Sequence, residues 1–243
     1  MKSENRESTS LNKFISDTGR CSRRQADEII RAGRVRINDV VARPGNRVEP
    51  GDKVTIDGKA IEAADKSGYV YIALNKPVGI ECTTDQRVEG NIIDFLGYPE
   101  RIFPIGRLDK PSEGLLLLTN HGDIVNKILR ARNAHEKEYI VSVNKPITSA
   151  FLKKMATGVP ILDTLTLPCF IEKIDKYKFR MILTQGLNRQ IRRMCKKLGY
   201  EVTGLKRVRI MNIRLGRLKT GKWRYLNKRE LSELKEMLRH SDK

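Results

Sequence analysis

The sequence predicts an α+β protein in which helices flank a mixed, largely antiparallel sheet, with a small separate domain at the N-terminus. Three observations lead to this fold class. Strand-like and helical segments follow one another along the chain without strict alternation. A chain of 243 residues that is 39% hydrophobic can bury the core of one ordinary domain and of one small domain. The segment AADKSG has the composition of a linker, so we expect domains at residues 1–66 and 67–243.

The N-terminal domain is expected to begin with two short helices. Apolar residues between Leu11 and Ile15 have the spacing of one helical face. Ser22 can cap the second helix, and Gly33 can end it. Residues 40–58 then hold two short apolar runs that Pro-Gly turns interrupt, which is typical of small strands.

The larger domain is expected to open with a strand at residues 69–77, where β-branched and aromatic residues alternate until Pro77. LLLL, at residues 115–118, is a fully apolar run that suits a strand. A final helix is expected to begin with a capping box of Asn227 and Glu230. Between these elements, in chain order, we expect a helix at 121–133, a strand at 137–146, a helix at 147–158, a strand at 178–184 and a helix at 188–200.

Positive charge dominates the composition. The formal net charge is +19 and the sequence pI is about 10.0. Such an excess favours a polyanionic partner, and nucleic acid is favoured over a membrane because no apolar run is long enough to span a bilayer. Residues 185–225 hold thirteen Lys or Arg and a single acid, Glu201, whereas residues 1–66 hold fourteen basic and eleven acidic residues. The strongest electrostatic footprint is therefore expected in the C-terminal half.

The sequence gives no sign of secretion or of a metal site. The N-terminal MKSENRESTS has no apolar stretch of the kind found in signal peptides, so we expect a cytoplasmic protein. The four cysteines are scattered, none closer than 26 residues to the next, which favours reduced, mostly buried thiols over a zinc pair or a compact disulfide framework. His121 and His135 lack the spacing of metal ligands, so no metal is expected.

GRLDKPSEGLLLLTN, at residues 106–120, places charged residues immediately before a strand that looks buried. Asp109 lies in a Pro-containing segment that breaks regular structure, where an Asp is more often a turn residue than a catalytic one. Glu113, four residues later, suggests the carboxylate pair of a glycosidase, but such pairs usually come from different elements. The residues alone leave the role of Asp109 open.

Two further side chains draw attention by their position. Arg192 lies at the border of the apolar arc of its helix, where it can turn inward to pair with a buried carboxylate. The helix can equally be an ordinary amphipathic surface helix. Tyr139 occupies a strand position that usually belongs to the core or the sheet surface, although beside a nucleic acid its ring can stack on a base. The apolar arc consists of Ile191, Met194, Cys195 and Leu198.

Residues 11–61 resemble the alpha-L RNA-binding module. The resemblance rests on LNKFISDTGRCSRRQADEIIRAGRVRIN followed by PGDKV. Arginines cluster on and around the second helix, where they can contact phosphates or form a solvated face balanced by Asp27 and Glu28. The members of this cluster that we expect to bind RNA are Arg23, Arg24 and Arg34.

Four motifs of the larger domain resemble those of one enzyme family. LNKPVGI, GRLDKPSEGLLLLTN, HEKEYIV and GLNRQIRRM, in this order after an alpha-L module, are similar to the motifs of the RsuA/RluF-type pseudouridine synthases. TNHG, at residues 119–122, is more like the RluF branch than the others. The resemblance implies the pseudouridine synthase fold with residues 115–118 as its buried central strand. It also implies a reaction that breaks the bond between uracil N1 and the ribose, turns the base and rejoins it through C5. Because reactant and product are isomers, no cofactor is expected.

The same resemblance implies roles for individual residues. Asp109 is the expected catalytic carboxylate, and Arg192 is expected to pair with it and keep it charged and oriented. Tyr139 matches a tyrosine that packs on the flipped uracil and helps with the proton at C5. Arg107 matches an arginine that enters the RNA stack where the base has left. The remaining expected RNA contacts are Arg189, Arg193 and Lys196.

Large-subunit ribosomal RNA is the expected substrate, and a tRNA anticodon stem-loop stays open as a second one. We expect a monomer that acts without a membrane. The alternatives are a non-catalytic RNA-binding or ribosome-assembly protein that kept the fold and, more weakly, a DNA glycosylase. The joint presence of Asp109, Tyr139 and Arg192 argues against a pure binder, and the alpha-L module points to RNA rather than DNA.

Overall fold

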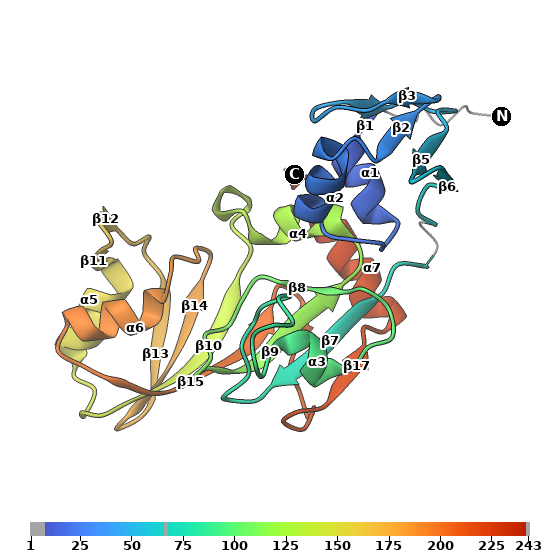
Figure 1. Cartoon of the computed structure of the whole chain (residues 1–243). Coiled ribbons are helices and arrows are strands. Elements are labelled where there is room, and N and C mark those ends of the chain that lie inside the picture. Colours follow the sequence, from blue (N-terminus) through green and yellow to red (C-terminus); the bar gives the residue numbers. More distant parts are fainter. Residues whose placement is uncertain (1–7, 66–67, 242–243) are drawn as a thin grey trace. The chain divides into compact units, whose positions relative to one another are not determined.

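The computed structural model describes residues 8–65 and 68–241 (Figure 1). The chain divides into two compact units, one formed by Met1–Tyr69 with Pro99–Arg101 and the other by Val70–Tyr98 with Ile102–Lys243. The predicted domain boundary between residues 66 and 67 lies outside the described residues. Within the described ranges, no helix combines the length and the apolarity that crossing a membrane requires.

The N-terminal unit pairs two short helices, as predicted. α1 (Leu11–Asp17) and α2 (Arg23–Arg31) pack their apolar faces into one small core. Ser22 forms a capping box with Gln25 at the start of α2, and Gly33 follows the helix with a φ of 69°. The strands are β1 (Thr9–Ser10) paired with β4 (Arg47–Val48), and an antiparallel sheet of β3 (Val40–Val41), β2 (Val35–Ile37), β5 (Val54–Ile56) and β6 (Lys59–Ile61).

Nine strands among the described residues form one sheet in the larger unit (Figure 1). Its order is β13-β14-β10-β15-β9-β7-β17, and β8 and β16 pair with β9 and β15. All paired neighbours are antiparallel except β9 and β15, which confirms the predicted mixed, largely antiparallel sheet. In chain order the strands are β7 (Tyr71–Lys76), β8 (Phe103–Ile105), β9 (Glu113–Thr119), β10 (Lys137–Val143), β13 (Phe170–Asp175), β14 (Lys178–Leu183), β15 (Val202–Ile210), β16 (Ile213–Arg214) and β17 (Trp223–Tyr225), while β11 (Pro160–Ile161) and β12 (Thr164–Leu165) form a separate hairpin.

Helices of the larger unit cover parts of this sheet. α5 (Ser149–Thr157) and α6 (Gln190–Lys197) share a hydrophobic core with β10 and β14. α3 (Ile92–Leu96) contributes to a second core with β7 and β9. α7 (Lys228–Met237) begins with the predicted capping box of Asn227 and Glu230. α4 (Gly122–Leu129) is shorter than the predicted helix at 121–133 because the backbone of Arg130 is extended, and a 3-10 turn follows at Ala131–Asn133.

β9 is the buried central strand that the four leucines predicted. It lies between β7 and β15, and Leu115–Leu118 are each at most 1% exposed. A strand that is buried on both faces needs a continuous apolar run, because successive side chains point to opposite faces. The strand begins at Glu113, so the segment that carries Asp109 leads directly into the centre of the sheet.

β15 was not predicted from the sequence, although it is the longest strand of the sheet and a neighbour of β9. Its sequence, VTGLKRVRI, contains one glycine and three cations, which is atypical of an interior strand. The cations are accommodated individually. Lys206 pairs with Glu113 at 3.7 Å, Arg209 Nε pairs with Glu138 at 2.8 Å, and Arg207 bonds to main-chain carbonyls. Partners that are distant in sequence therefore allow this charged segment to form an interior strand.

Candidate active site

Asp109 lies in a short loop between β8 and β9. The main-chain oxygen of Asp109 accepts a hydrogen bond from the N–H of Ser112 at 2.9 Å, which closes a turn around Lys110 and Pro111. The preceding Leu108 is buried, and its N–H donates to Cys82 Sγ at 3.4 Å. The Asp109 side chain itself is 31% exposed. The sequence thus places a partly exposed carboxylate at the edge of a buried core.

Arg192 of α6 turns toward this loop. Its Nε lies 3.7 Å from Asp109 Oδ2, which is an ion pair longer than a hydrogen bond, and its side chain is 14% exposed. Its Nη2 donates to the main-chain oxygen of Pro111 and to Ser112 Oγ, both at 3.0 Å. Burial lowers the pKa of Arg192, and the negative charge of Asp109 opposes that shift. The two residues that the sequence predicted as partners are therefore within ion-pair distance.

The helical periodicity explains why Arg192 faces inward. Ile191, Met194 and Cys195 are buried in the core that α6 shares with the sheet, as predicted. Arg192 borders this apolar arc, so its side chain runs along the core and reaches the loop, whereas Arg193 on the next position is exposed.

Tyr139 lies on β10. It is partly buried and packs against two hydrophobic clusters. One cluster contains Leu108, the neighbour of Asp109, and the other contains Ile191, the neighbour of Arg192. The ring therefore lies beside the same region of the core as the other two predicted site residues.

Arg107 extends away from the core beside Asp109. Its side chain is 72% exposed, and its Nη2 lies 3.6 Å from Glu81 Oε1. An exposed pair of this kind contributes little to stability, because solvent screens it. The guanidinium is thus accessible at the position where the resemblance predicts contact with the RNA stack.

Lys76 is a site component that the sequence analysis missed. It is the last residue of β7, it is fully buried, and its Nζ donates to the main-chain oxygens of Ser112 and Pro77 at 2.8 and 2.9 Å. Burial lowers the pKa of Lys76, while nearby negative charges, including that of Asp109, oppose this shift. The signal was a lysine at the end of a predicted strand whose earlier residues are mostly apolar, directly before Pro77.

Asp109 and Glu113, which suggested the carboxylate pair of a glycosidase, have separate partners in the structure. Glu113 is the first residue of β9, and its Oε1 lies 3.7 Å from Lys206 Nζ of β15. Glu113 therefore forms an ion pair with a residue of the neighbouring strand, whereas Asp109 forms one with Arg192 of α6.

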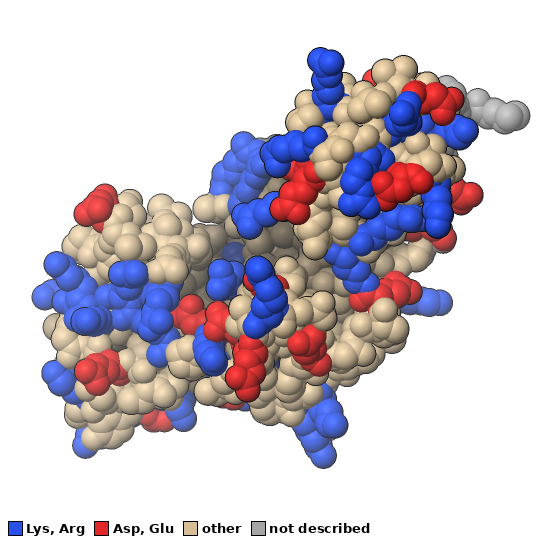
Figure 2. Space-filling model, viewed as in Figure 1, with Lys and Arg blue, Asp and Glu red and all other residues tan. Residues whose placement is uncertain are grey.

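The predicted RNA contacts fall into two groups, one in each unit. Arg189, Arg193 and Lys196 are exposed on and beside α6, and Arg193 also bonds to Asn188, which precedes the helix. Figure 2 shows Lys and Arg side chains gathered over this part of the larger unit, where Figure 1 places α5 and α6. In the N-terminal unit, Arg23 and Arg24 are exposed at the start of α2. Arg34 is exposed as well but forms two hydrogen bonds with Asp57, at 2.8 and 2.6 Å.

Comparison with protein families gives two matches. A family model described as RNA pseudouridylate synthase matches residues 70–197, which include Asp109, Tyr139 and Arg192. A model of the S4 domain matches residues 9–54, and this confirms the predicted alpha-L module.

Individual relatives are similar over nearly the whole chain. Dual-specificity RNA pseudouridine synthase RluF from Salmonella typhi is 54% identical over 234 residues, which cover 96% of this chain and 81% of that protein. The protein of the same name from Escherichia coli K12 is 53% identical over the same shares of both chains. Ribosomal large subunit pseudouridine synthase B from Bacillus subtilis is 34% identical, covering 95% of this chain and 97% of that protein. A crystal structure of a pseudouridylate synthase superposes with a TM-score of 0.68 at 28% identity, covering 94% of this chain and 99% of that one.

Proposed function

The chain belongs to the RNA pseudouridylate synthase family and is an isomerase, and we propose that it converts one specific uridine of large-subunit ribosomal RNA into pseudouridine. The ribosomal substrate is supported by the Bacillus subtilis relative, whose name specifies the large ribosomal subunit. The RluF relatives are described as having dual specificity, and a tRNA anticodon stem-loop is our candidate for a second substrate. Both substrates are folded RNAs. We also propose that the protein is a cytoplasmic monomer and that it acts on them without binding a membrane.

The observation that carries the proposal is the ion pair of Asp109 and Arg192 beside Tyr139. In the net reaction the bond between ribose C1′ and uracil N1 breaks and a bond between C1′ and C5 forms. The proton on C5 is lost and N1 gains one, so no oxidant, reductant or group donor takes part. The target base must leave its stack to expose C5, which requires flipping into a pocket.

Each residue has a task that suits its position. The ionised carboxylate of Asp109 serves as nucleophile or base toward the flipped nucleotide. Arg192 supports the charged form and holds the loop through Pro111 and Ser112. Tyr139 packs on the uracil ring and assists removal of the C5 proton. Arg107 takes the place of the flipped base in the stack, for which its planar guanidinium is suited.

RNA affinity is proposed to come mainly from phosphate contacts outside the pocket. The S4 domain contributes Arg23, Arg24 and Arg34, and the exposed face of α6 contributes Arg189, Arg193 and Lys196. Such contacts position the RNA but carry no sequence information directly. The choice of uridine therefore depends on RNA shape and on the pocket.

Mapping of pseudouridines in ribosomal RNA and tRNA tests this proposal. RNA is compared from cells with the gene, without it, and without it but supplied with the Asp109→Asn variant. One large-subunit site should disappear on deletion and stay absent with the variant. If the site persists without the gene, the assigned substrate is wrong. If the variant restores the site, the proposed role of Asp109 is wrong.

A further inference from the structure

Arg207 is a cation in the middle of the sheet. It lies on β15, is only 3% exposed, and is paired across the sheet with Tyr139 of β10 on one side and Gly114 of β9 on the other. Gly114 makes this position possible, because a Cβ there would lie 2.3 Å from the main-chain oxygen of Arg207. The close approach of the two backbones places Arg207 directly beside the end of the Asp109 loop.

The side chain of Arg207 contacts both the start of that loop and the strand that follows it. Its Nε donates to the main-chain oxygen of Leu115 at 2.7 Å, and its Nη1 donates to that of Arg107 at a longer 3.4 Å. Arg107 precedes Asp109 by two residues, and Leu115 follows it by six. One planar guanidinium therefore connects the start of the loop to the third residue of β9.

This contact differs from those of the other two cations beside the loop. Arg192 and Lys76 bond to the last two residues of the loop, Pro111 and Ser112, and Arg192 also faces the carboxylate of Asp109. Arg207 bonds instead to the main-chain oxygens of Arg107, near the start of the loop, and of Leu115, inside β9. Its hydrogen bonds to the loop therefore involve the backbone and not the carboxylate of Asp109.

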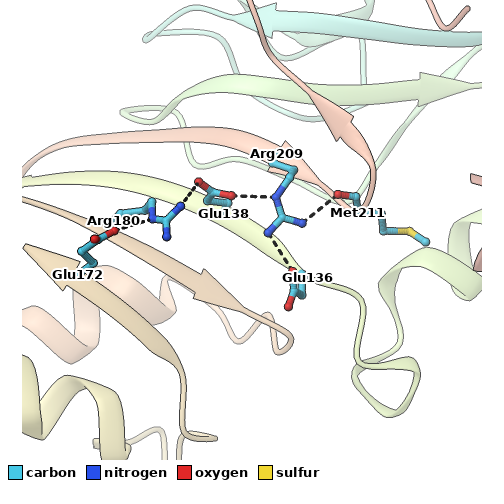
Figure 3. Close-up of polar contacts among 6 residues, drawn as sticks. All are labelled: Glu136, Glu138, Glu172, Arg180, Arg209 and Met211. Carbon is cyan, nitrogen blue, oxygen red and sulfur yellow. Dashed lines mark hydrogen bonds and ion pairs between the residues drawn. The ribbon is translucent and has the colours of Figure 1, made fainter. Parts of the chain in front are cut away.

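The surroundings of Arg207 are not those of an ordinary structural arginine. Among the residues that the structure describes, no carboxylate lies within 4.0 Å of its guanidinium, and its buried Nη2 has no hydrogen-bond partner. Both features disfavour a buried arginine unless another role retains it. Arg209, two residues later on the same strand, has the usual arrangement. It pairs with Glu138 and Glu136 and donates to the main-chain oxygen of Met211 (Figure 3).

We propose that Arg207 is a positioning residue that ties the start of the Asp109 loop to β9 and thereby holds the carboxylate in its reactive place. The inference rests on the proposed catalytic role of Asp109. It adds an anchor at the start of the loop, because Arg192 and Lys76 fix only the end of the loop and Arg192 also the carboxylate itself.

The test compares Arg207→Met and Arg207→Lys with Arg209→Met and Arg209→Lys in the full chain. The two arginines share a strand and are both largely shielded from solvent, but only Arg207 contacts the loop. Arg207→Met should slow single-turnover pseudouridine formation about 100-fold, because a displacement near 1 Å at a reacting group has this order of effect. Arg207→Lys should recover only part of the loss, since one ammonium cannot span both carbonyls. RNA affinity should stay within about twofold, because no phosphate contact is removed.

Amide hydrogen exchange supplies a readout that does not depend on activity. The N–H of Ser112, which bonds to the main-chain oxygen of Asp109, should exchange about tenfold faster in Arg207→Met than in the wild type, because the start of the loop is no longer tied to β9. The two Arg209 variants should lower thermal stability but leave both the rate per folded molecule and this exchange nearly unchanged.

The outcomes separate the inference from the proposed function. Wild-type rates and wild-type Ser112 exchange in both Arg207 variants would overturn the positioning role. If Arg207→Met does not fold, the single-turnover rate and the Ser112 exchange are measured on Arg207→Lys instead. Full turnover in Asp109→Asn would remove the proposed catalytic role, yet the exchange data would still show whether Arg207 anchors the loop. Equal effects in the Arg207 and Arg209 variants would mean that both act only through general stability.

Discussion

Arg192 Nε lies 3.7 Å from Asp109 Oδ2, and the same guanidinium donates to the backbone oxygen of Pro111 and the hydroxyl of Ser112. One side chain thus contacts both the carboxylate and the loop that carries it. This relationship links the charge of Asp109 to its position, and it leads to the first prediction.

Arg192→Ala should reduce single-turnover pseudouridine formation by about 100-fold or more, because the carboxylate loses its cation and the loop loses two bonds. Arg192→Lys should recover a minor part, since a lysine restores charge but cannot donate to Pro111 and Ser112 at once. Arg193→Ala is the matched control, because Arg193 is the exposed neighbour on the same helix. It should weaken RNA binding instead. Equal single-turnover rates for Arg192→Ala and the wild type at saturating RNA would contradict the pairing role.

Lys137 should make the stability of the protein depend on pH. It is 6% exposed, and burial together with the charge of Arg207 lowers its pKa to about 8. An unfolded lysine has a pKa of about 10.4, so between these values the unfolded chain binds more protons than the folded protein. Stability from this residue therefore rises with pH through that window, and below about pH 8 the buried charge is a cost.

Lys137→Met should accordingly be more stable than the wild type at pH 7, by about 1 to 3 kcal/mol in the free energy of unfolding. The difference should shrink as the pH approaches 10. Urea unfolding of both proteins at pH 7, 8, 9 and 10 measures it. If the stability difference between the two proteins does not change across this pH range, burial does not lower the pKa of Lys137.

Arg107 should act on turnover more than on affinity. Its guanidinium is 72% exposed beside Asp109, where it can fill the space that the flipped base leaves. Arg107→Ala should slow single-turnover conversion of a structured RNA more than it raises the Kd. Arg107→Lys should rescue poorly, because it restores the charge without a flat stacking surface. Complete rescue by lysine at fixed salt would make Arg107 an ordinary phosphate contact.

Lys196 should contribute to affinity without selecting the RNA. It is exposed on α6, off the buried face of the helix. Lys196→Ala should weaken binding of related and unrelated RNAs about equally and should lower the slope of log Kd against log salt by roughly 0.7 to 1. Lys235→Ala, an exposed lysine of α7 that is not among the predicted contacts, is the control. A variant of Lys196 with an unchanged salt slope would remove this residue from the RNA interface.

The sequence was sufficient to predict the features that depend on local pattern. The run from Leu115 to Leu118 is continuous because β9 is buried on both faces. The inward turn of Arg192 follows from the spacing of Ile191, Met194 and Cys195 around it. Both are consequences of one element's own periodicity, which neighbouring residues display directly.

Features that depend on distant partners were not predicted. β15 carries three cations, and the residues that pair with two of them, Glu113 of β9 and Glu138 of β10, are far away in the sequence. The sequence did not show what Lys76 and Arg207 bind, because their acceptors are main-chain oxygens that any residue could provide. Such contacts depend on the backbone path of the folded chain, and a side-chain pattern does not record that path.

The central claim is that the carboxylate of Asp109 performs the chemistry, and the direct measurement is single-turnover pseudouridine formation by purified Asp109→Asn on one folded large-subunit RNA fragment. The amide keeps the shape of the side chain and loses its charge. We therefore expect no product, together with a Kd for the RNA close to that of the wild type and intact folding. Appreciable product from Asp109→Asn would contradict the account, because the reaction would then proceed without the carboxylate.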